Sequence, residues 1–271
     1  MLRHTRALLL LVAATMLGLA ACGGGAAGQV AVPAGPTADG RAGTPPALSG
    51  TVSVFAAASL TSSFQQIATD FQDAHPGVEV VLNFGGSSSL AQQIVSGAPA
   101  DVFAAASPAT MKTVVAAGDA TGPQVFVRNR LEIAVPPDNP GAISGLADFG
   151  RESAKLALCA PEVPCGAAAT KVFTAAGITA RPDTLEQDVK AVLSKVMLGE
   201  VDAGLVYRTD VLAAGAKVKG LDFPEADKAI NDYPVVRLTA APNAAAADAF
   251  VAYVLGAEGQ AVLAAAGFET V

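Results

Sequence analysis

The chain has 271 residues, of which 52% are hydrophobic and 15% charged, so it can bury one or two cores and is not an intrinsically disordered polymer. Its formal net charge is −7, and this sum includes two arginines of an N-terminal leader, so the rest of the chain is more negative still. This charge argues against nucleic acid as a partner, and an anionic ligand must be held by local donors and dipoles.

The first 21 residues have the design of a secretory signal peptide. Arg3 and Arg6 precede an apolar stretch, Ala7–Met16, that is short for a transmembrane span and is followed by small residues. Leu19-Ala20-Ala21-Cys22 resembles a bacterial lipobox, which implies that Cys22 is lipidated and anchors the chain to the outer face of the cell membrane. Residues 22–48 are rich in Gly, Ala and Pro and predict a flexible tether.

Strand and helix patterns then alternate up to about residue 130. Buried strands are expected at Thr51–Ala57, Val78–Phe84 and Asp101–Ala105, and helical spacing follows each of them, at residues 64–71, at 90–95 and from Pro108 onward. Such alternation predicts a parallel sheet with right-handed crossovers.

A second α/β region begins after Arg130. Its predicted strands are Leu131–Val135, Leu156–Ala160 and Ala203–Tyr207, and its predicted helices are Thr170–Ala176, Val189–Leu198 and Thr209–Ala214. The tail consists of a strand pattern at Pro234–Leu238 and two alanine-rich helical stretches that end at Gly267.

Two cysteines remain once Cys22 is assigned to lipid. Cys159 and Cys165 lie close together in LCAPEVPCG, and an extracytoplasmic compartment permits a disulfide, which we predict. The alternatives are a zinc site and a pair of free buried thiols. Zinc is disfavoured because His75, in an exposed-looking DAHPG turn far away in sequence, is the only histidine beyond the leader.

Ser59 and Ser87 each follow a buried strand and precede a helical pattern. Ligands of open α/β sheets bind at the carboxyl ends of strands, where helix N-termini present free N–H groups and partial positive charge. The small residues Ala56–Ala58 and Gly85-Gly86 let a small anion approach the backbone. The alternative is that both serines are helix N-caps.

Several motifs in order resemble the molybdate-binding proteins of bacterial ABC importers. They are VFAAASLT at 54–61, FGGSSSLAQQI at 84–94, GAPADVFAAAS at 97–107, PEVPCG at 161–166, EQDVKAVLSKV at 186–196 and GLVYRTD at 204–210. The resemblance covers nearly the whole chain from Gly50 onward.

This resemblance implies an α/β fold of the periplasmic-binding-protein kind, with two lobes joined by a hinge. Each lobe is expected to hold a mostly parallel sheet flanked by helices. Lobe 1 would comprise residues 49–130 and 235–271, and lobe 2 residues 131–234, so that the C-terminal helices complete the first lobe.

The resemblance also implies a ligand set. The oxyanion is expected to contact the hydroxyl and backbone N–H of Ser59 and Ser87, the backbone N–H of Cys165 and of Val189, and the hydroxyl of Tyr207. Ser87 is preferred to Ser88 in this alignment. The disulfide would hold the Cys165 donor in place, and Asp188 is expected to cap the helix that starts at Val189, facing away from the ligand. A packing role remains the alternative for Tyr207.

These residues lead to a functional expectation. An uncharged, all-donor site suits a fully deprotonated dianion, and the resemblance implies that this dianion is molybdate or tungstate, with sulfate or phosphate as alternatives. We expect no cofactor, no direct cation site, a monomer, and an ABC permease as partner. A serine hydrolase is less favoured, because the chain has no GxSxG elbow and neither serine has a base in prospect.

Overall fold

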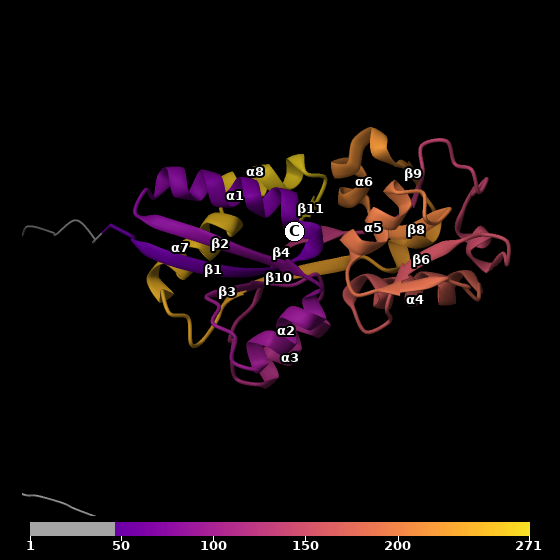
Figure 1. The fold of residues 1–271 in the computed structure, drawn as a ribbon. Helices are drawn as coiled ribbons and strands as arrows, with labels where there is room; N and C mark the ends of the chain where they lie inside the picture. Colours follow the sequence, from indigo (N-terminus) through magenta and orange to yellow (C-terminus); the bar gives the residue numbers. More distant parts are fainter. Residues whose placement is uncertain (1–46) are drawn as a thin grey trace, which may run out of the picture. The chain divides into compact units, whose positions relative to one another are not determined.

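The protein is represented by a computed structural model that describes residues 47–271. The predicted signal peptide, the anchor at Cys22 and nearly all of the tether predicted for residues 22–48 lie outside the described residues. Two sheets organise the described part, and helices pack on each of them (Figure 1). We call the part around the six-stranded sheet lobe 1 and the part around the five-stranded sheet lobe 2. Within residues 47–271, no helix combines the length and the apolar character that crossing a membrane requires.

Lobe 1 contains twelve elements from both ends of the described chain. They are β1 (Gly50–Ala57), η1 (Ala58–Leu60), α1 (Thr61–Ala74), β2 (Val78–Gly85), α2 (Ser87–Val95), β3 (Val102–Ala104), α3 (Pro108–Ala116), β4 (Gln124–Asn129), β10 (Asn231–Arg237), α7 (Ala244–Leu255), α8 (Ala257–Ala265) and β11 (Glu269–Thr270). The strand order is β11-β4-β10-β3-β1-β2. β1 pairs in parallel with β2 and β3, as the alternating pattern predicted.

Lobe 2 is formed by the middle of the chain. Its elements are β5 (Leu131–Val135), η2 (Leu146–Gly150), β6 (Leu156–Cys159), α4 (Pro164–Ala176), β7 (Thr184–Glu186), α5 (Val189–Met197), β8 (Ala203–Tyr207), α6 (Arg208–Ala214), η3 (Gly215–Lys217), β9 (Lys219–Leu221) and η4 (Pro224–Lys228). The strand order is β7-β6-β8-β5-β9. The helix expected at Thr170 begins at Pro164, so Cys165 lies in the first turn of α4 rather than in a separate turn.

Both sheets are mixed, which corrects the expectation of mostly parallel sheets. In lobe 1, β10 runs antiparallel to β3 and β4, and β11 runs antiparallel to β4. In lobe 2, β5 runs antiparallel to β8 and β9. At β5 and β10 the chain enters the second sheet and returns to the first, so no βαβ crossover within one sheet sets the direction of these two strands.

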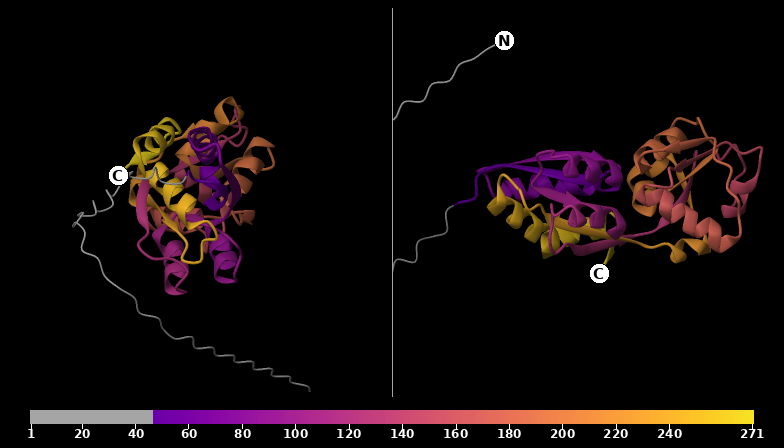
Figure 2. Two further views of the ribbon diagram at one scale, coloured as in Figure 1. Left: turned by 90° about the vertical axis from the view of Figure 1, so that its left-hand side faces the viewer. Right: turned by 90° about the horizontal axis from the view of Figure 1, so that it is seen from below.

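The chain passes between the lobes twice, and the two passages lie beside each other. β4 ends at Asn129 and β5 begins at Leu131, while β10 begins at Asn231 after η4 (Figure 2). Asn129 and Asn231 are partners in the antiparallel ladder between β4 and β10. The return to the first sheet therefore occurs at Asn231, before the boundary expected between residues 234 and 235.

The C-terminal helices pack on the N-terminal part of lobe 1. Phe250 of α7 lies edge-on to Phe64 and Phe71 of α1, at ring-centroid distances of 6.2 and 5.3 Å. All three rings are fully buried. The apolar residues of the tail thus find their core in lobe 1, where aromatic and aliphatic burial stabilises the fold.

Candidate functional site

The five residues predicted as ligands line a single small cavity between the lobes. Its walls are formed by small residues and helix starts: Ala57, Ala58, Ser59, Gly85, Gly86, Ser87 and Ala106 from lobe 1, and Val163, Pro164, Cys165, Gln187, Asp188, Val189 and Tyr207 from lobe 2. The cavity volume open to the centre of a water-sized sphere is about 20 Å³. Pockets for drug-sized ligands measure roughly 300–1,000 Å³, so this cavity suits a much smaller ligand.

Each of the five residues stands where a helix begins. Ser59 lies in η1, which runs into α1, Ser87 is the first residue of α2, Cys165 the second of α4, and Val189 the first of α5. Tyr207 precedes α6. The first N–H groups of a helix have no acceptor within it, and they carry the positive end of its dipole. Helix starts from both lobes therefore meet at one cavity.

Local sequence explains why these helices start where they do. Pro164 occupies the first turn of α4, where its missing N–H removes no helical hydrogen bond. Asp188 caps α5, and its Oδ1 accepts the N–H of Ala191 at 3.0 Å, which confirms its predicted capping role. That bond satisfies a donor deeper in the helix and leaves the Val189 N–H at the cavity.

The two serines are not helix caps. The N-cap positions are Leu60 for α1 and Gly86 for α2, and neither helix has a side-chain capping bond. Instead, Ser59 Oγ is 2.9 Å from Tyr233 Oη, and Ser87 Oγ accepts the backbone N–H of Ala106 at 3.0 Å. The capping alternative is therefore wrong for both serines, and their hydroxyls belong to the cavity wall.

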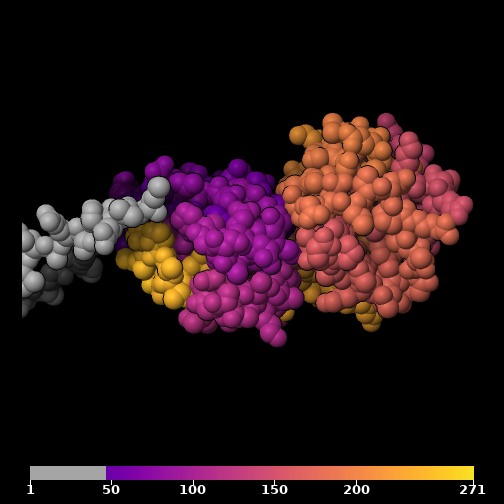
Figure 3. Space-filling model, turned by 60° about the horizontal axis from the view of Figure 1, so that its bottom comes forward, coloured from indigo at the N-terminus to yellow at the C-terminus, as the bar shows by residue number. Residues whose placement is uncertain are grey.

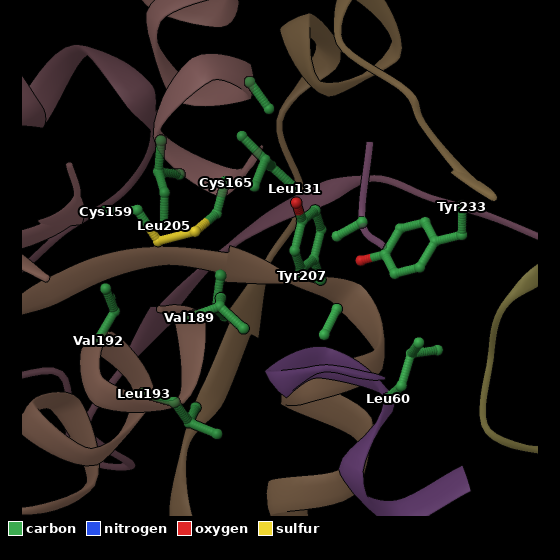
Figure 4. Close-up of a cluster of buried hydrophobic side chains, with 14 of the residues drawn as sticks. Leu60, Leu131, Cys159, Cys165, Val189, Val192, Leu193, Leu205, Tyr207 and Tyr233 are labelled. Carbon is green, nitrogen blue, oxygen red and sulfur yellow. A yellow bond between two sulfur atoms is a disulfide. The ribbon is translucent and has the colours of Figure 1, made fainter. Parts of the chain in front are cut away.

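Tyr207 is held from two sides. Its Oη accepts a hydrogen bond from Asn231 Nδ2 at 3.0 Å, and its backbone N–H donates to Asp210 Oδ2 at 3.1 Å. Burial raises the pKa of the Tyr207 phenol well above its ordinary value, so the hydroxyl stays protonated and can donate. Figure 4 shows the Tyr233 ring beside it with its hydroxyl directed toward Tyr207, and the ring centroids are 5.9 Å apart.

No lysine or arginine lines this cavity. Behind it in lobe 2, Lys190 Nζ lies 2.8 Å from Oδ1 of the fully buried Asp210. Burial raises the pKa of the Asp210 carboxyl, and the Lys190 ammonium opposes this shift. The pair compensates its own charge, so the groups at the cavity that can donate to an anion are helix N–H groups and hydroxyls.

A disulfide joins Cys159 at the end of β6 to Cys165 in the first turn of α4, as predicted (Figure 4). Their Cα atoms are 5.7 Å apart. The next residue, Gly166, packs so tightly that a Cβ there would lie 1.9 Å from the carbonyl oxygen of Ala160. The disulfide and this close contact together fix the start of α4, and with it the Cys165 N–H, against the sheet. Residues 47–271 contain no cluster of His, Cys, Asp and Glu suited to a metal ion.

The two lobes also touch directly at the rim of the cavity. Ser88 Oγ in lobe 1 donates to the carbonyl oxygen of Glu162 in lobe 2 at 2.8 Å. The backbone at Gly86 approaches lobe 2 so closely that a Cβ there would lie 2.1 Å from the Gln187 carbonyl oxygen. Figure 3 shows the seam at which purple residues of lobe 1 meet orange residues of lobe 2. The lobes are therefore in contact at the rim of the cavity, and the two serines differ in role: Ser87 lines the cavity and Ser88 bonds across the seam.

The sequence profile described as "Bacterial extracellular solute-binding protein" matches residues 52–269, which is most of the chain. This chain belongs to that family.

Individual relatives agree with this assignment. The molybdate-binding protein ModA of Mycobacterium tuberculosis (strain ATCC 25618 / H37Rv) is 41% identical over 260 residues, covering 96% of this chain and 95% of that one. The periplasmic molybdate-binding protein of Azotobacter vinelandii has a similar structure, with a TM-score of 0.72 at 23% identity over 81% of this chain and 99% of that one. The sulfate-binding protein SubI from Mycobacterium tuberculosis H37Rv reaches a TM-score of 0.70 at 17% identity, covering 82% and 87%.

The two structural likenesses show the fold alone, and they confirm the predicted α/β, periplasmic-binding-protein-like architecture. The family assignment and the ModA relative confirm the family predicted from the motifs. The relatives are solute-binding proteins, so the expectation of a binding protein rather than a serine hydrolase is confirmed as well.

Three residues of this solute-binding protein's site escaped the sequence analysis. Asn231 and Tyr233 start β10 and hydrogen bond to Tyr207 and Ser59, and Ala106 supplies the backbone N–H that Ser87 accepts. Ala106 lay in a motif already noted, GAPADVFAAAS. Nothing in the segment NDY at 231–233 predicts that the returning strand passes behind the cavity, because that depends on long-range sheet pairing.

Proposed function

We propose that this solute-binding protein captures molybdate, and tungstate as well, in the cavity between its lobes and delivers it to an ABC permease. The observation that carries the proposal is the convergence of uncharged donors from five helix starts on one small cavity between the lobes. The name of the 41% identical relative supports molybdate as the ligand.

The donor set suits a dianion of this kind. Each hydrogen bond to a charged group contributes about 1.5–3 kcal/mol, so a few such bonds outweigh the cost of ordering a small ligand and make micromolar or tighter binding attainable. Lysine or arginine side chains at the cavity would bind the dianion more strongly but would release it less readily. Hydroxyl and amide donors allow capture when the lobes close and release when they open.

Sulfate is the alternative ligand, because it has the same charge and also lacks a proton. The size of the closed cavity decides between sulfate and the larger molybdate. The likeness to SubI concerns the fold and does not favour sulfate at this sequence distance.

Calorimetry tests the proposal directly. Molybdate and tungstate should bind one to one at micromolar concentration or tighter, and a ligand at a hundred times its Kd should add about 2.7 kcal/mol to the free energy of unfolding. Sulfate is the size control and phosphate the protonation control. Heat from phosphate with none from molybdate would refute molybdate as the ligand.

We further propose that Cys22 is lipidated and that the mature protein is anchored on the outer face of the membrane. The signal-like leader and Leu19-Ala20-Ala21-Cys22 support this, and an extracellular solute-binding family fits the compartment. Cys22→Ser should abolish labelling of the protein by a fatty-acid analogue in growing cells. Labelling that persists in this variant would rule out Cys22 as the attachment point.

A further inference from the structure

Two of the three hydroxyl oxygens of the assigned ligand set, those of Ser87 and Tyr207, already accept hydrogen bonds from the protein. Ser87 Oγ accepts the Ala106 N–H at 3.0 Å, and Tyr207 Oη accepts an Asn231 N–H at 3.0 Å. A hydroxyl that accepts in this way keeps its own proton for another partner. At both residues the direction of the hydroxyl is thus set by a group outside the ligand set assigned above.

The orientation of the Asn231 amide follows from its other contact. Its Nδ2 also lies 2.8 Å from the carbonyl oxygen of Ala106. A carbonyl can only accept, so the amide must present its NH₂ group there and not its oxygen. The second proton of the same NH₂ group then points at Tyr207 Oη. Because Asn231 is 8% exposed, water competes little for these bonds.

We propose that Asn231 is a positioning residue that determines specificity: by donating to Tyr207, it makes the tyrosine offer a proton to the cavity, and the site then rejects oxyanions that carry a proton. This inference rests on the proposed oxyanion-binding function. The inference adds Asn231, which lies outside the ligand set, as the residue that makes the site discriminate between protonated and unprotonated oxyanions.

Hydrogen phosphate and sulfate isolate this effect. At mildly alkaline pH both are tetrahedral dianions of similar size, and they differ by one proton. Hydrogen phosphate needs an acceptor for that proton, and the hydroxyl and N–H groups of the assigned ligand set provide none. Asp188 is the one carboxylate at the cavity, and its Oδ1 is engaged in capping α5.

The test is the ratio of the Kd for hydrogen phosphate to the Kd for sulfate, measured by calorimetry at one mildly alkaline pH for wild type and Asn231→Asp. An aspartate carboxyl, ionised or protonated, offers an oxygen that accepts the Tyr207 proton, so Tyr207 turns a lone pair toward the cavity. Wild type should favour sulfate at least tenfold. N231D should lower that ratio at least tenfold, which equals about 1.4 kcal/mol. An added charge repels both dianions alike and leaves the ratio unchanged.

Asn129→Asp is the matched control. Asn129 pairs with Asn231 across the β4–β10 ladder and is also buried, at 2% exposed against 8%, but its amide donates to Thr209 Oγ1, which is not at the cavity. N129D should keep the wild-type ratio within about twofold. If N231D does not fold, as judged by its melting curve, Asn231→Leu removes the donor without a charge and should lower the ratio in the same direction.

Each outcome decides between the two claims. Tight molybdate binding with an unchanged ratio in N231D, or the same ratio change in N129D, overturns the role of Asn231 and leaves the proposed function standing. A wild-type protein that binds hydrogen phosphate as well as sulfate overturns the inference directly, and Asp188 would then be the acceptor to examine. A wild-type protein that binds none of the three anions overturns both.

Discussion

Ser87 has two roles at the cavity wall. Its hydroxyl oxygen accepts the buried N–H of Ala106, and its proton is left for a ligand. Only 1% of the residue is exposed, so no water replaces either bond when the hydroxyl is lost. The free protein and the complex therefore both depend on this side chain.

We expect Ser87→Ala to weaken oxyanion binding by about 10–100-fold, because a hydrogen bond to a charged ligand contributes about 1.5–3 kcal/mol. It should also lower the free energy of unfolding of the ligand-free protein by about 1 kcal/mol, since the Ala106 N–H loses its acceptor. Calorimetry and denaturant unfolding measure the two effects. Ser89→Ala, an exposed serine of the same motif, is the control. Equal affinities for S87A and S89A would contradict the assignment of Ser87.

The predictability of the site differs from residue to residue. Ser59 and Ser87 could be located because strand ends, small residues and helix starts are local patterns. Tyr207 required the family resemblance, since a strand-end tyrosine is commonly a packing residue. Cys165 and Val189 required it as well, because any residue type can supply a main-chain N–H donor. Asn231 and Tyr233 could not be found, because their contacts span 24 and 174 positions of sequence.

At the scale of elements, the junction between β2 and α2 decides how closely the lobes approach. Gly85 and Gly86 connect the strand to the helix, and the two positions differ in surroundings. A Cβ at Gly85 would lie 3.6 Å from Leu90, an ordinary contact, whereas one at Gly86 would lie 2.1 Å from the Gln187 carbonyl of lobe 2. Gly86 therefore belongs to the closing surface, and Gly85 does not.

Gly86→Ala should hinder closure and weaken oxyanion binding at least tenfold, with a change below about 1 kcal/mol in the free energy of unfolding of the open, ligand-free protein, because a surface substitution costs little. Gly145→Ala is the control: a Cβ there meets no other atom within 4 Å and Gly145 is not at the cavity, so this variant should keep near-wild-type affinity. Calorimetry gives the affinities, and small-angle X-ray scattering shows whether molybdate still makes the protein more compact. Compaction of G86A equal to wild type would show that Gly86 does not limit closure.

Most helices and strands could be predicted from hydrophobic periodicity. The errors in their bounds and directions occur where the sequence has no such periodicity. β5 and β8 have the predicted bounds, but the start of α4 was placed six residues late because its first turn contains Pro164, Cys165 and Gly166 rather than an amphipathic pattern. The direction of β10 could not be predicted, since a buried strand reads the same in either direction. This is why the sheets were expected to be more parallel than they are.

At the scale of the whole molecule, net charge and local site oppose each other. The chain carries a formal charge of −7, yet the cavity between its lobes is built to receive an anion. The long-range field repels a dianion, whereas the short-range donors bind it. At 0.1 M, salt screens the long-range repulsion between protein and dianion over about 10 Å, and it hardly affects the interaction with buried dipoles.

Raising sodium chloride from about 0.05 to 0.5 M should therefore leave the oxyanion affinity unchanged or increase it up to a few-fold. A site that relied on exposed lysine or arginine would instead lose affinity over this range. Titration at several salt concentrations separates the two, with sodium acetate in place of sodium chloride as a check that chloride does not compete. A tenfold weakening would mean that cations outside the cavity contribute to binding.

Tyr207 and Asn231 lie on opposite lobes, on β8 and β10, and their contact has a kinetic consequence. If the halves separate to admit a guest, the tyrosine leaves its amide partner and can rotate its proton either way. An open protein would then admit all small tetrahedral anions equally well. Discrimination among them would begin only when the lobes come together again. The preference for one anion over another should accordingly be seen in the dissociation rate constants, and hardly at all in the association rate constants.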